Sequence, residues 1–141
     1  MPSSQEFAAE LGRVARRWRT RLDARLKHLG LTQARWMTLL RLKHHGPLSQ
    51  RDLADQVGVE GPTLVRLLDA LEKKHLIDRC DLEGDRRVKV VHLTDSAMPI
   101  IDDITRISDA FTKELVGDIP SEDLATAQRV LRLIGDRLER E

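Results

Sequence analysis

Residues 49–73, SQRDLADQVGVEGPTLVRLLDALEK, decide the fold of this chain. Ser49 stands three residues before Asp52, a spacing typical of the start of a helix. The inward positions of that helix are Leu53, Ala54 and Val57. Gly58 predicts a tight turn, and Pro62 suits the first turn of a second helix, where its missing N–H is not needed. The stretch therefore predicts two short helices joined by a tight turn.

The second of these helices has two different faces. Its buried stripe recurs at helical spacing and consists of Leu64, Leu68 and Leu71. Thr63, Arg66 and Ala70 lie together on the opposite face. Two helices joined at a glycine, the second with polar groups exposed near its N-terminus, form a helix-turn-helix pattern.

A hairpin is expected directly after this pair of helices. Residues 76–80 and the Val-rich residues 87–93 read as short strands, and residues 81–85 between them are turn formers. A hairpin in this position is a wing. The expected fold class is mainly α with a small β-hairpin wing, a winged helix-turn-helix.

Long amphipathic helices flank this lobe on both sides. The first carries an apolar stripe at Phe7, Leu11, Val14, Trp18, Leu22, Leu26 and Leu29. Gly30 ends it, and Thr32 caps the next helix. The helix after the wing has apolar positions at Met98, Ile101, Ile104, Ile107, Phe111 and Leu115, and Pro99 predicts a kink or a late start. The last helix, with Ser121 as cap, repeats in steps of three and four at Leu124, Ala127, Leu131, Ile134 and Leu138.

Pairing of two copies would bury these terminal stripes. We divide the chain into an N-terminal dimerisation helix (1–30), a DNA-binding lobe (31–93) and C-terminal dimerisation helices (94–141). The residues expected at the dimer interface are Leu11, Val14, Phe111, Leu115, Leu131 and Leu138. The alternative is that the terminal helices fold back on their own lobe. We call the helix that carries Thr63 and Arg66 the recognition helix. A two-fold dimer would place its two recognition helices about 34 Å apart, in successive major grooves of duplex DNA.

Composition fits a protein of the cytoplasm. The 141 residues contain one cysteine, Cys80, and neither a secretory signal nor an apolar run of membrane-spanning length is recognisable. The net charge is +1, but residues 1–34 carry +4 and residues 93–141 carry −5. A basic front suggests a polyanion partner, although solvated helix faces explain the charges equally well.

Two clusters of side chains are the predicted DNA contacts. On the recognition helix they are Gly61, Pro62, Thr63 and Arg66, and on the wing they are Asp85, Arg86 and Arg87. A guanidinium such as that of Arg66 can bind O6 and N7 of guanine together. Wing arginines suit a narrow minor groove, with Asp85 orienting one of them while the other reaches out. Each arginine alone reads as an ordinary solvated side chain, and their joint placement is what favours DNA.

These residues also carry a family resemblance. The matching motifs are the run 57–66, VGVEGPTLVR, followed by Leu71-Glu72-Lys73-Lys74, Leu76-Ile77-Asp78-Arg79, Asp85-Arg86-Arg87 and Leu93-Thr94. Together they resemble the MarR family of bacterial regulators, and residues 60–66, Leu31-Thr32-Gln33 with Trp36, and residues 97–101 resemble its SlyA branch. The resemblance implies a homodimer on pseudo-palindromic, AT-rich operators, acting as a repressor or as an activator that displaces silencing proteins.

The resemblance also implies an effector and leaves two departures. Small aromatic carboxylates or phenols are the expected ligands, with Arg16 and Arg19 for the carboxylate and Trp36 and Thr32 lining the cleft. The alternative is that the tryptophans are core residues and the arginines are solvated. His75 stands where the family usually has Gly, and Gly61 replaces a usual polar residue, which puts the operator sequence in doubt.

Other chemistries are less favoured. Cys80, beside Arg79, reads either as a redox switch or, as we favour, as a small buried hydrophobe. We expect no metal and no cofactor, because the five histidines lack paired ligand spacing. Phosphate loops and nucleophile elbows are missing from the sequence, so an enzyme is not expected. A winged helix used only for protein association would have lost the exposed arginines, which this chain keeps.

Overall fold

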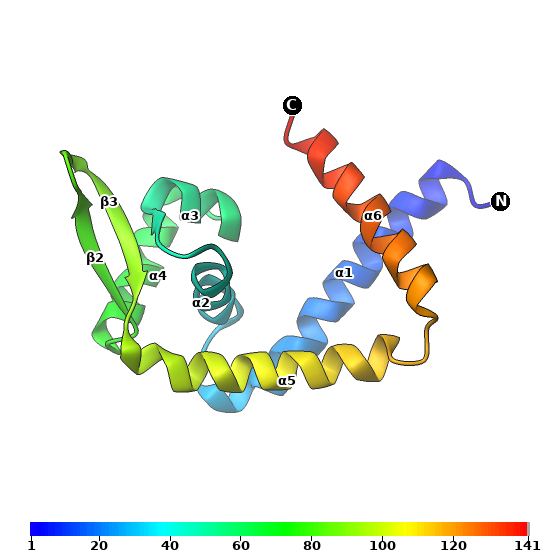
Figure 1. Cartoon of the computed structure of the whole chain (residues 1–141), viewed down its shortest axis with the longest axis horizontal. Coiled ribbons are helices and arrows are strands. Elements are labelled where there is room, and N and C mark those ends of the chain that lie inside the picture. The colour runs from blue at the N-terminus through cyan, green and yellow to red at the C-terminus, as the bar shows by residue number, and fades with distance from the viewer. Residues whose placement is uncertain (141) are drawn as a thin grey trace. The chain divides into compact units, whose positions relative to one another are not determined.

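The computed structural model describes residues 1–140, and Figure 1 traces the chain. It forms two compact units, Met1–Ile107 and the segment from Ser108 onward. The helices of the described residues are α1 (Ser4–Leu26), α2 (Gln33–His45), α3 (Gln50–Val57), α4 (Gly61–Lys73), α5 (Met98–Val116) and α6 (Ser121–Leu138). The strands are β1 (Leu48–Ser49), β2 (Ile77–Leu82) and β3 (Asp85–Leu93). The predicted fold class, mainly α with a hairpin wing, is confirmed.

The helix starts follow the predicted caps in the lobe. The Thr32 hydroxyl accepts a hydrogen bond from the Arg35 backbone N–H at 3.4 Å, and the Ser49 hydroxyl accepts one from that of Asp52 at 3.1 Å. Each bond satisfies a backbone donor that the first turn of a helix leaves free. α6 differs, because Pro120 rather than Ser121 precedes its first turn and supplies no side-chain cap. The expectation that Ser121 caps this helix was wrong.

One apolar core holds α2, α3, α4 and the sheet together. Its fully buried members are Leu39, Leu42, Leu53, Leu64, Leu68, Leu71, Ile77 and Val91. The predicted stripe of α4 lies entirely within this set. Removing one leucine side chain of this size from water contributes about 1.5–3 kcal/mol. The core therefore fixes which face of α4 is left for solvent.

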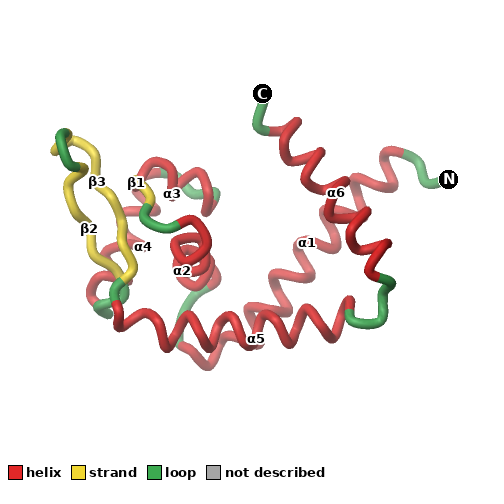
Figure 2. Tube along the Cα trace, in the orientation of Figure 1, coloured by secondary structure: helices red, strands yellow, loops and turns green. Residues whose placement is uncertain are grey.

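The sheet is antiparallel with strand order β1-β3-β2, as Figure 2 shows in yellow. β2 and β3 form the predicted hairpin, with Cys80 opposite Val90 and Asp78 opposite His92. Both strands extend further toward the turn than the sequence indicated, so that Asp85 already belongs to β3. β1 was not predicted, because two residues are too short to show any periodicity.

The helix after the wing begins late, as its proline predicts. A short 3-10 turn, Asp95–Ala97, comes first, and α5 then begins at Met98 with Pro99 in its first turn. In that position a proline removes no helical hydrogen bond. None of the helices in residues 1–140 combines the length and the apolar character that crossing a bilayer requires.

The turn between α4 and β2 depends on a residue in a strained conformation. His75 has a φ of 61°, in the left-handed region that favours glycine, the residue that the family usually has at this position. Its backbone N–H donates to the carbonyl oxygen of Glu72 at 2.9 Å, and its own carbonyl accepts from the Thr94 hydroxyl at 2.6 Å. These bonds hold the turn in place although a side chain with a Cβ atom disfavours it.

Replacing His75 with glycine should stabilise the protein. The His75→Gly change relieves the left-handed strain and adds chain entropy to the unfolded state, and we expect a net gain of about 0.5–1 kcal/mol. Chemical denaturation of the variant and of His75→Ala, which keeps the Cβ atom, measures the difference. A His75→Gly protein less stable than wild type would contradict this origin of the strain.

Candidate nucleic-acid interface

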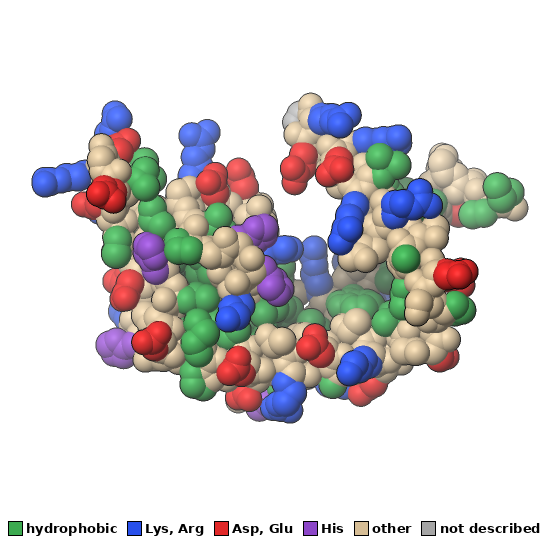
Figure 3. All heavy atoms as spheres, viewed as in Figure 1, with side chains coloured by type: hydrophobic (Ala, Val, Ile, Leu, Met, Phe, Trp, Pro, Cys, Tyr) green, Lys and Arg blue, Asp and Glu red, His purple; other side chains and the backbone are tan. Residues whose placement is uncertain are grey.

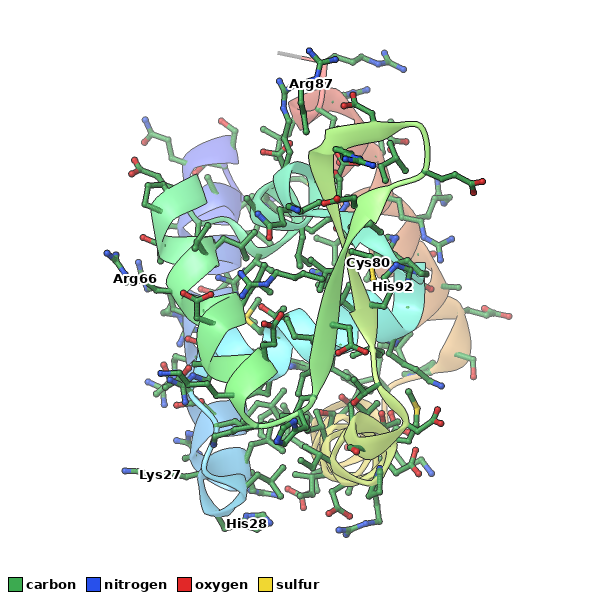
Figure 4. The ribbon with its side chains drawn as sticks, turned by 90° about the vertical axis from the view of Figure 1, so that its left-hand side faces the viewer. Lys27, His28, Arg66, Cys80, Arg87 and His92 are labelled. Carbon is green, nitrogen blue, oxygen red and sulfur yellow. The ribbon has the colours of Figure 1, made fainter. Side chains whose placement is uncertain are left out.

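The exposed face of α4 carries the residues predicted to contact DNA. Gly61, Pro62, Thr63 and Arg66 are all exposed, whereas the leucines of the opposite face are buried. In Figure 4 Arg66 points away from the body of the lobe. Within residues 1–140 its guanidinium takes part in no ion pair, so its donors are available to an external acceptor.

Sequence reasoning missed one neighbour on this face. Val65 is 40% exposed although it is a large apolar residue. A branched apolar group on an exposed helix face suits contact with the methyl group of thymine. The burial of Leu64 and Leu67 on the opposite face shows why Val65 points outward.

The hairpin tip holds one arginine and leaves the other free. The Asp85 carboxylate accepts hydrogen bonds from the backbone N–H of Arg87 at 3.0 Å and from its Nε at 3.1 Å. Arg86 is exposed and makes no ion pair within the described residues. The predicted pairing of Asp85 with one wing arginine is therefore present. Figure 3 shows Lys and Arg side chains projecting from this end of the hairpin.

The hydrogen bonds from Arg87 lower the pKa of the Asp85 carboxyl below its usual range, the side-chain bond contributing most and the backbone bond next. The Asp85 carboxylate is therefore ionised at neutral pH and accepts both hydrogen bonds from Arg87. Lys89 pairs in the same way with Asp81 across the hairpin.

A second arginine links the hairpin to α4. The Nη2 of Arg79, on β2, lies 2.6 Å from Asp69 Oδ1, and its Nε lies 3.0 Å from Glu72 Oε2. Both carboxylates belong to α4. The hydrogen bond to Glu72, and then that to Asp69, raise the pKa of Arg79 against the opposing effect of partial burial. Arg79 therefore faces α4 and is not placed to activate Cys80.

Cys80 is exposed. The interpretation of it as a small buried hydrophobe was wrong, because β2 alternates and turns Ile77 and Arg79 toward α4 while Asp78 and Cys80 face outward. Within residues 1–140 the structure gathers no cluster of His, Cys, Asp and Glu suited to a metal ion.

The predicted effector residues are only partly brought together. A groove of about 300 Å³ between α1 and α2 is lined by Trp18, Arg19, Leu22, Trp36, Met37, Leu40, Arg41 and His44. Arg19 and Trp36 belong to it, whereas Arg16 and Thr32 do not. The indole N–H of Trp36 donates to Asp23 Oδ1 at 3.0 Å, so that donor is already used.

Most residues predicted at a dimer interface are exposed apolar side chains. In the first unit these are Leu11 and Val14, and in the second unit they are Leu115, Leu131 and Leu138. Phe111 differs, since it is only 3% exposed in the single chain and its side chain is already covered. Exposed leucines in such number, on long helices, are unusual for a protein that stays monomeric.

Comparison with known proteins gives the same assignment for sequence and fold. Residues 31–89 match the MarR family. The crystal structure of the transcriptional regulator PA3341 is 44% identical to this chain, covers 96% of it and 99% of its own length, and has a TM-score of 0.88. MepR from S. aureus, crystallised in a DNA-binding conformation, is 27% identical over 94% of this chain and 98% of its own, with a TM-score of 0.83. AbsC from Streptomyces coelicolor, at 20% identity, covers 100% of this chain and 99% of its own and shares the fold with a TM-score of 0.82.

An NMR titration of the Asp85 carboxyl tests the contact at the hairpin tip. Its pKa should lie below the value of about 3.9 of an unperturbed aspartate, and Arg87→Gln should bring it back toward that value. Because the pKa is lower in the folded hairpin, the contact favours folding above the unperturbed pKa and is lost as the pH falls through the lowered value. The same pKa in both proteins would show that Arg87 does not hold Asp85.

Proposed function

Because this chain belongs to the MarR family of transcriptional regulators, we propose that it is a homodimer of the SlyA type that binds duplex DNA sequence-specifically at a pseudo-palindromic operator. The observation that carries this proposal is the unpaired, outward-facing guanidinium of Arg66 on α4, together with the free Arg86 on the hairpin of the same lobe.

The recognition helix enters the major groove. Arg66 binds O6 and N7 of a guanine through its two parallel N–H donors, and Thr63 one turn earlier contacts a phosphate or a thymine methyl. The backbone N–H groups of Gly61 and Thr63 at the helix start face a phosphate, which the positive end of the helix dipole favours. Phosphate contacts set the register, and base contacts supply the sequence preference.

The wing enters the neighbouring minor groove. Asp85 pairs with Arg87, whose side chain remains 90% exposed, and Arg86 reaches outward without a competing carboxylate. A narrow minor groove has an enhanced negative potential that attracts such a side chain. One lobe therefore holds the duplex at two places, with α4 and with the hairpin.

Dimerisation uses the two ends of the chain, 1–30 and 94–141, and leaves 31–93 as the DNA-binding lobe. The exposed apolar side chains of α1 and α6 support this division, because pairing of two copies would remove them from water. A two-fold axis then repeats the lobe on the next turn of the duplex, about 34 Å away. Such a regulator works where the DNA is, in the cytoplasm.

A small phenol or aromatic carboxylate would act through the groove between α1 and α2. Arg19 and Arg41 supply positive charge there, and Trp18 supplies aromatic surface, whereas Trp36 is only 4% exposed and belongs to the core. A ligand that prefers a spacing of the two lobes unsuited to successive grooves lowers the affinity for DNA. The proposed sensing site therefore lies outside the DNA-binding face.

The base contact is tested by replacing Arg66. Arg66→Ala should lose about 1–3 kcal/mol of discrimination between a duplex selected by the wild-type protein and a scrambled duplex. Arg106→Ala, which removes an equally charged surface side chain from α5, is the control and should keep the discrimination. Titrations at two salt concentrations separate the shared phosphate contribution. Equal losses on the selected and scrambled duplexes would show that Arg66 does not contact bases.

The pairing of the terminal helices is tested on α6. Leu131 and Leu133 are 49% and 47% exposed, but only Leu131 belongs to the repeat in steps of three and four. Leu131→Asp should give a monomer in sedimentation equilibrium, and Leu133→Asp should remain a dimer. Unchanged mass for Leu131→Asp, or dissociation of both variants alike, would exclude this seam.

A further inference from the structure

The two proposed DNA-contacting parts of the lobe, α4 and the hairpin, share the apolar core at the base of the hairpin, where Ile77 and Val91 are buried. Along the chain, α4 passes into β2 through the turn at His75, which hydrogen bonds to Glu72 and Thr94 fix at the base of the hairpin. Beyond this buried base most residues of β2 are exposed, so the core does not fix the outer part of the hairpin against the helix. A second attachment further along the hairpin would remove that freedom.

Arg79 provides this second attachment. It is the third residue of β2, and its guanidinium reaches Asp69 at 2.6 Å and Glu72 at 3.0 Å. These two carboxylates are three residues apart, so they lie on the same side of α4. The planar fork of an arginine can bind two acceptors at once, whereas an ammonium group cannot bind them in one plane. The side chain of Arg79 is 20% exposed, much less than either partner, so the guanidinium lies between the two elements rather than in solvent.

The same contact affects the chemistry of the recognition helix. Asp69 lies three residues after Arg66, within reach of an ion pair along the helix. While Arg79 engages Asp69, the Arg66 guanidinium stays unpaired, as the structure shows. Arg79 also offsets part of the negative charge that Asp69 and Glu72 would otherwise present to phosphates.

We propose that Arg79 is a positioning residue that fixes the hairpin to the recognition helix and keeps Asp69 away from Arg66, so that helix and wing fit one duplex. This rests on the proposed function, since it concerns how DNA is recognised rather than whether DNA is bound. Arg79 itself contacts no DNA in this arrangement. Its effect is therefore on discrimination between sequences more than on general affinity.

Two variants that change the charge in opposite directions test the proposal. Arg79→Gln removes one positive charge, and Asp69→Ala with Glu72→Ala removes two negative charges while keeping Arg79. General electrostatics predicts weaker binding of a scrambled duplex by the first and tighter binding by the second. Loss of the attachment predicts that both discriminate worse, by about tenfold, between the selected and the scrambled duplex.

Controls separate positioning from folding and from charge. Arg106→Gln removes one guanidinium from an ion pair on α5 and should keep wild-type discrimination. Arg79→Lys keeps the charge without the fork and should restore discrimination only in part. If Arg79→Gln unfolds, as thermal melting would show, the double alanine variant decides the question, because alanine favours the helix.

The outcomes are distinguishable. Wild-type discrimination in the double alanine variant would overturn the attachment of the hairpin by Arg79, and discrimination by Arg79→Gln equal to that of Arg106→Gln would overturn both roles of Arg79. A wild-type protein that binds selected and scrambled duplexes equally would instead overturn the proposed function.

Discussion

The burial of one leucine stripe on α4 determines what the rest of the lobe can do. Leu64, Leu68 and Leu71 are almost completely inaccessible to solvent, and each contributes about 1.5–3 kcal/mol through removal from water. An exposed ion pair contributes at most about 1 kcal/mol, so charges on α4 cannot rotate it against this packing. The helix must therefore turn Thr63 and Arg66 outward. Groups that cost little to leave in solvent are thereby placed where a polyanion can reach them.

Polar contacts act within the arrangement that the core imposes. Asp85 pairs with one wing arginine, and Arg79 spans two carboxylates of α4. Neither contact is needed to make the hairpin, which the antiparallel pairing of β2 and β3 already provides. In the proposed complex Arg79 keeps the angle between helix and hairpin, whereas Asp85 orients a side chain within β3. Small energies are sufficient for this, since they choose between orientations of elements that are already folded.

Much of this fold follows from sequence patterns with a physical cause. The helix starts at Thr32 and Ser49 and the late start at Pro99 are local chemistry, and His75, which stands where the family usually has glycine, has a positive φ. Long apolar stripes likewise predicted the helices correctly. What the sequence could not supply depends on contacts between distant segments. The two-residue β1 exists only because it pairs with Val90 and Val91.

The candidate sites show the same division. The pairing of Asp85 was predictable because its partner is two residues away, whereas Arg79 meets residues seven and ten positions earlier across the turn. Cys80 faces solvent because of the register of β2, which its type alone does not reveal. The Thr32 hydroxyl caps α2 and lies outside the groove that Trp36 lines.

The central claim is that the recognition helix and the wing of each lobe bind the same duplex, and that a two-fold axis relates the two bound lobes. Footprinting of the wild-type protein on a selected duplex tests this claim most directly. Guanine-N7 methylation interference reports the major groove, and hydroxyl-radical cleavage reports the minor groove. Two equivalent patches about one helical turn apart are expected, each with interference in the major groove beside protection in the minor groove. A single patch without symmetry, or contacts confined to one groove, would contradict it.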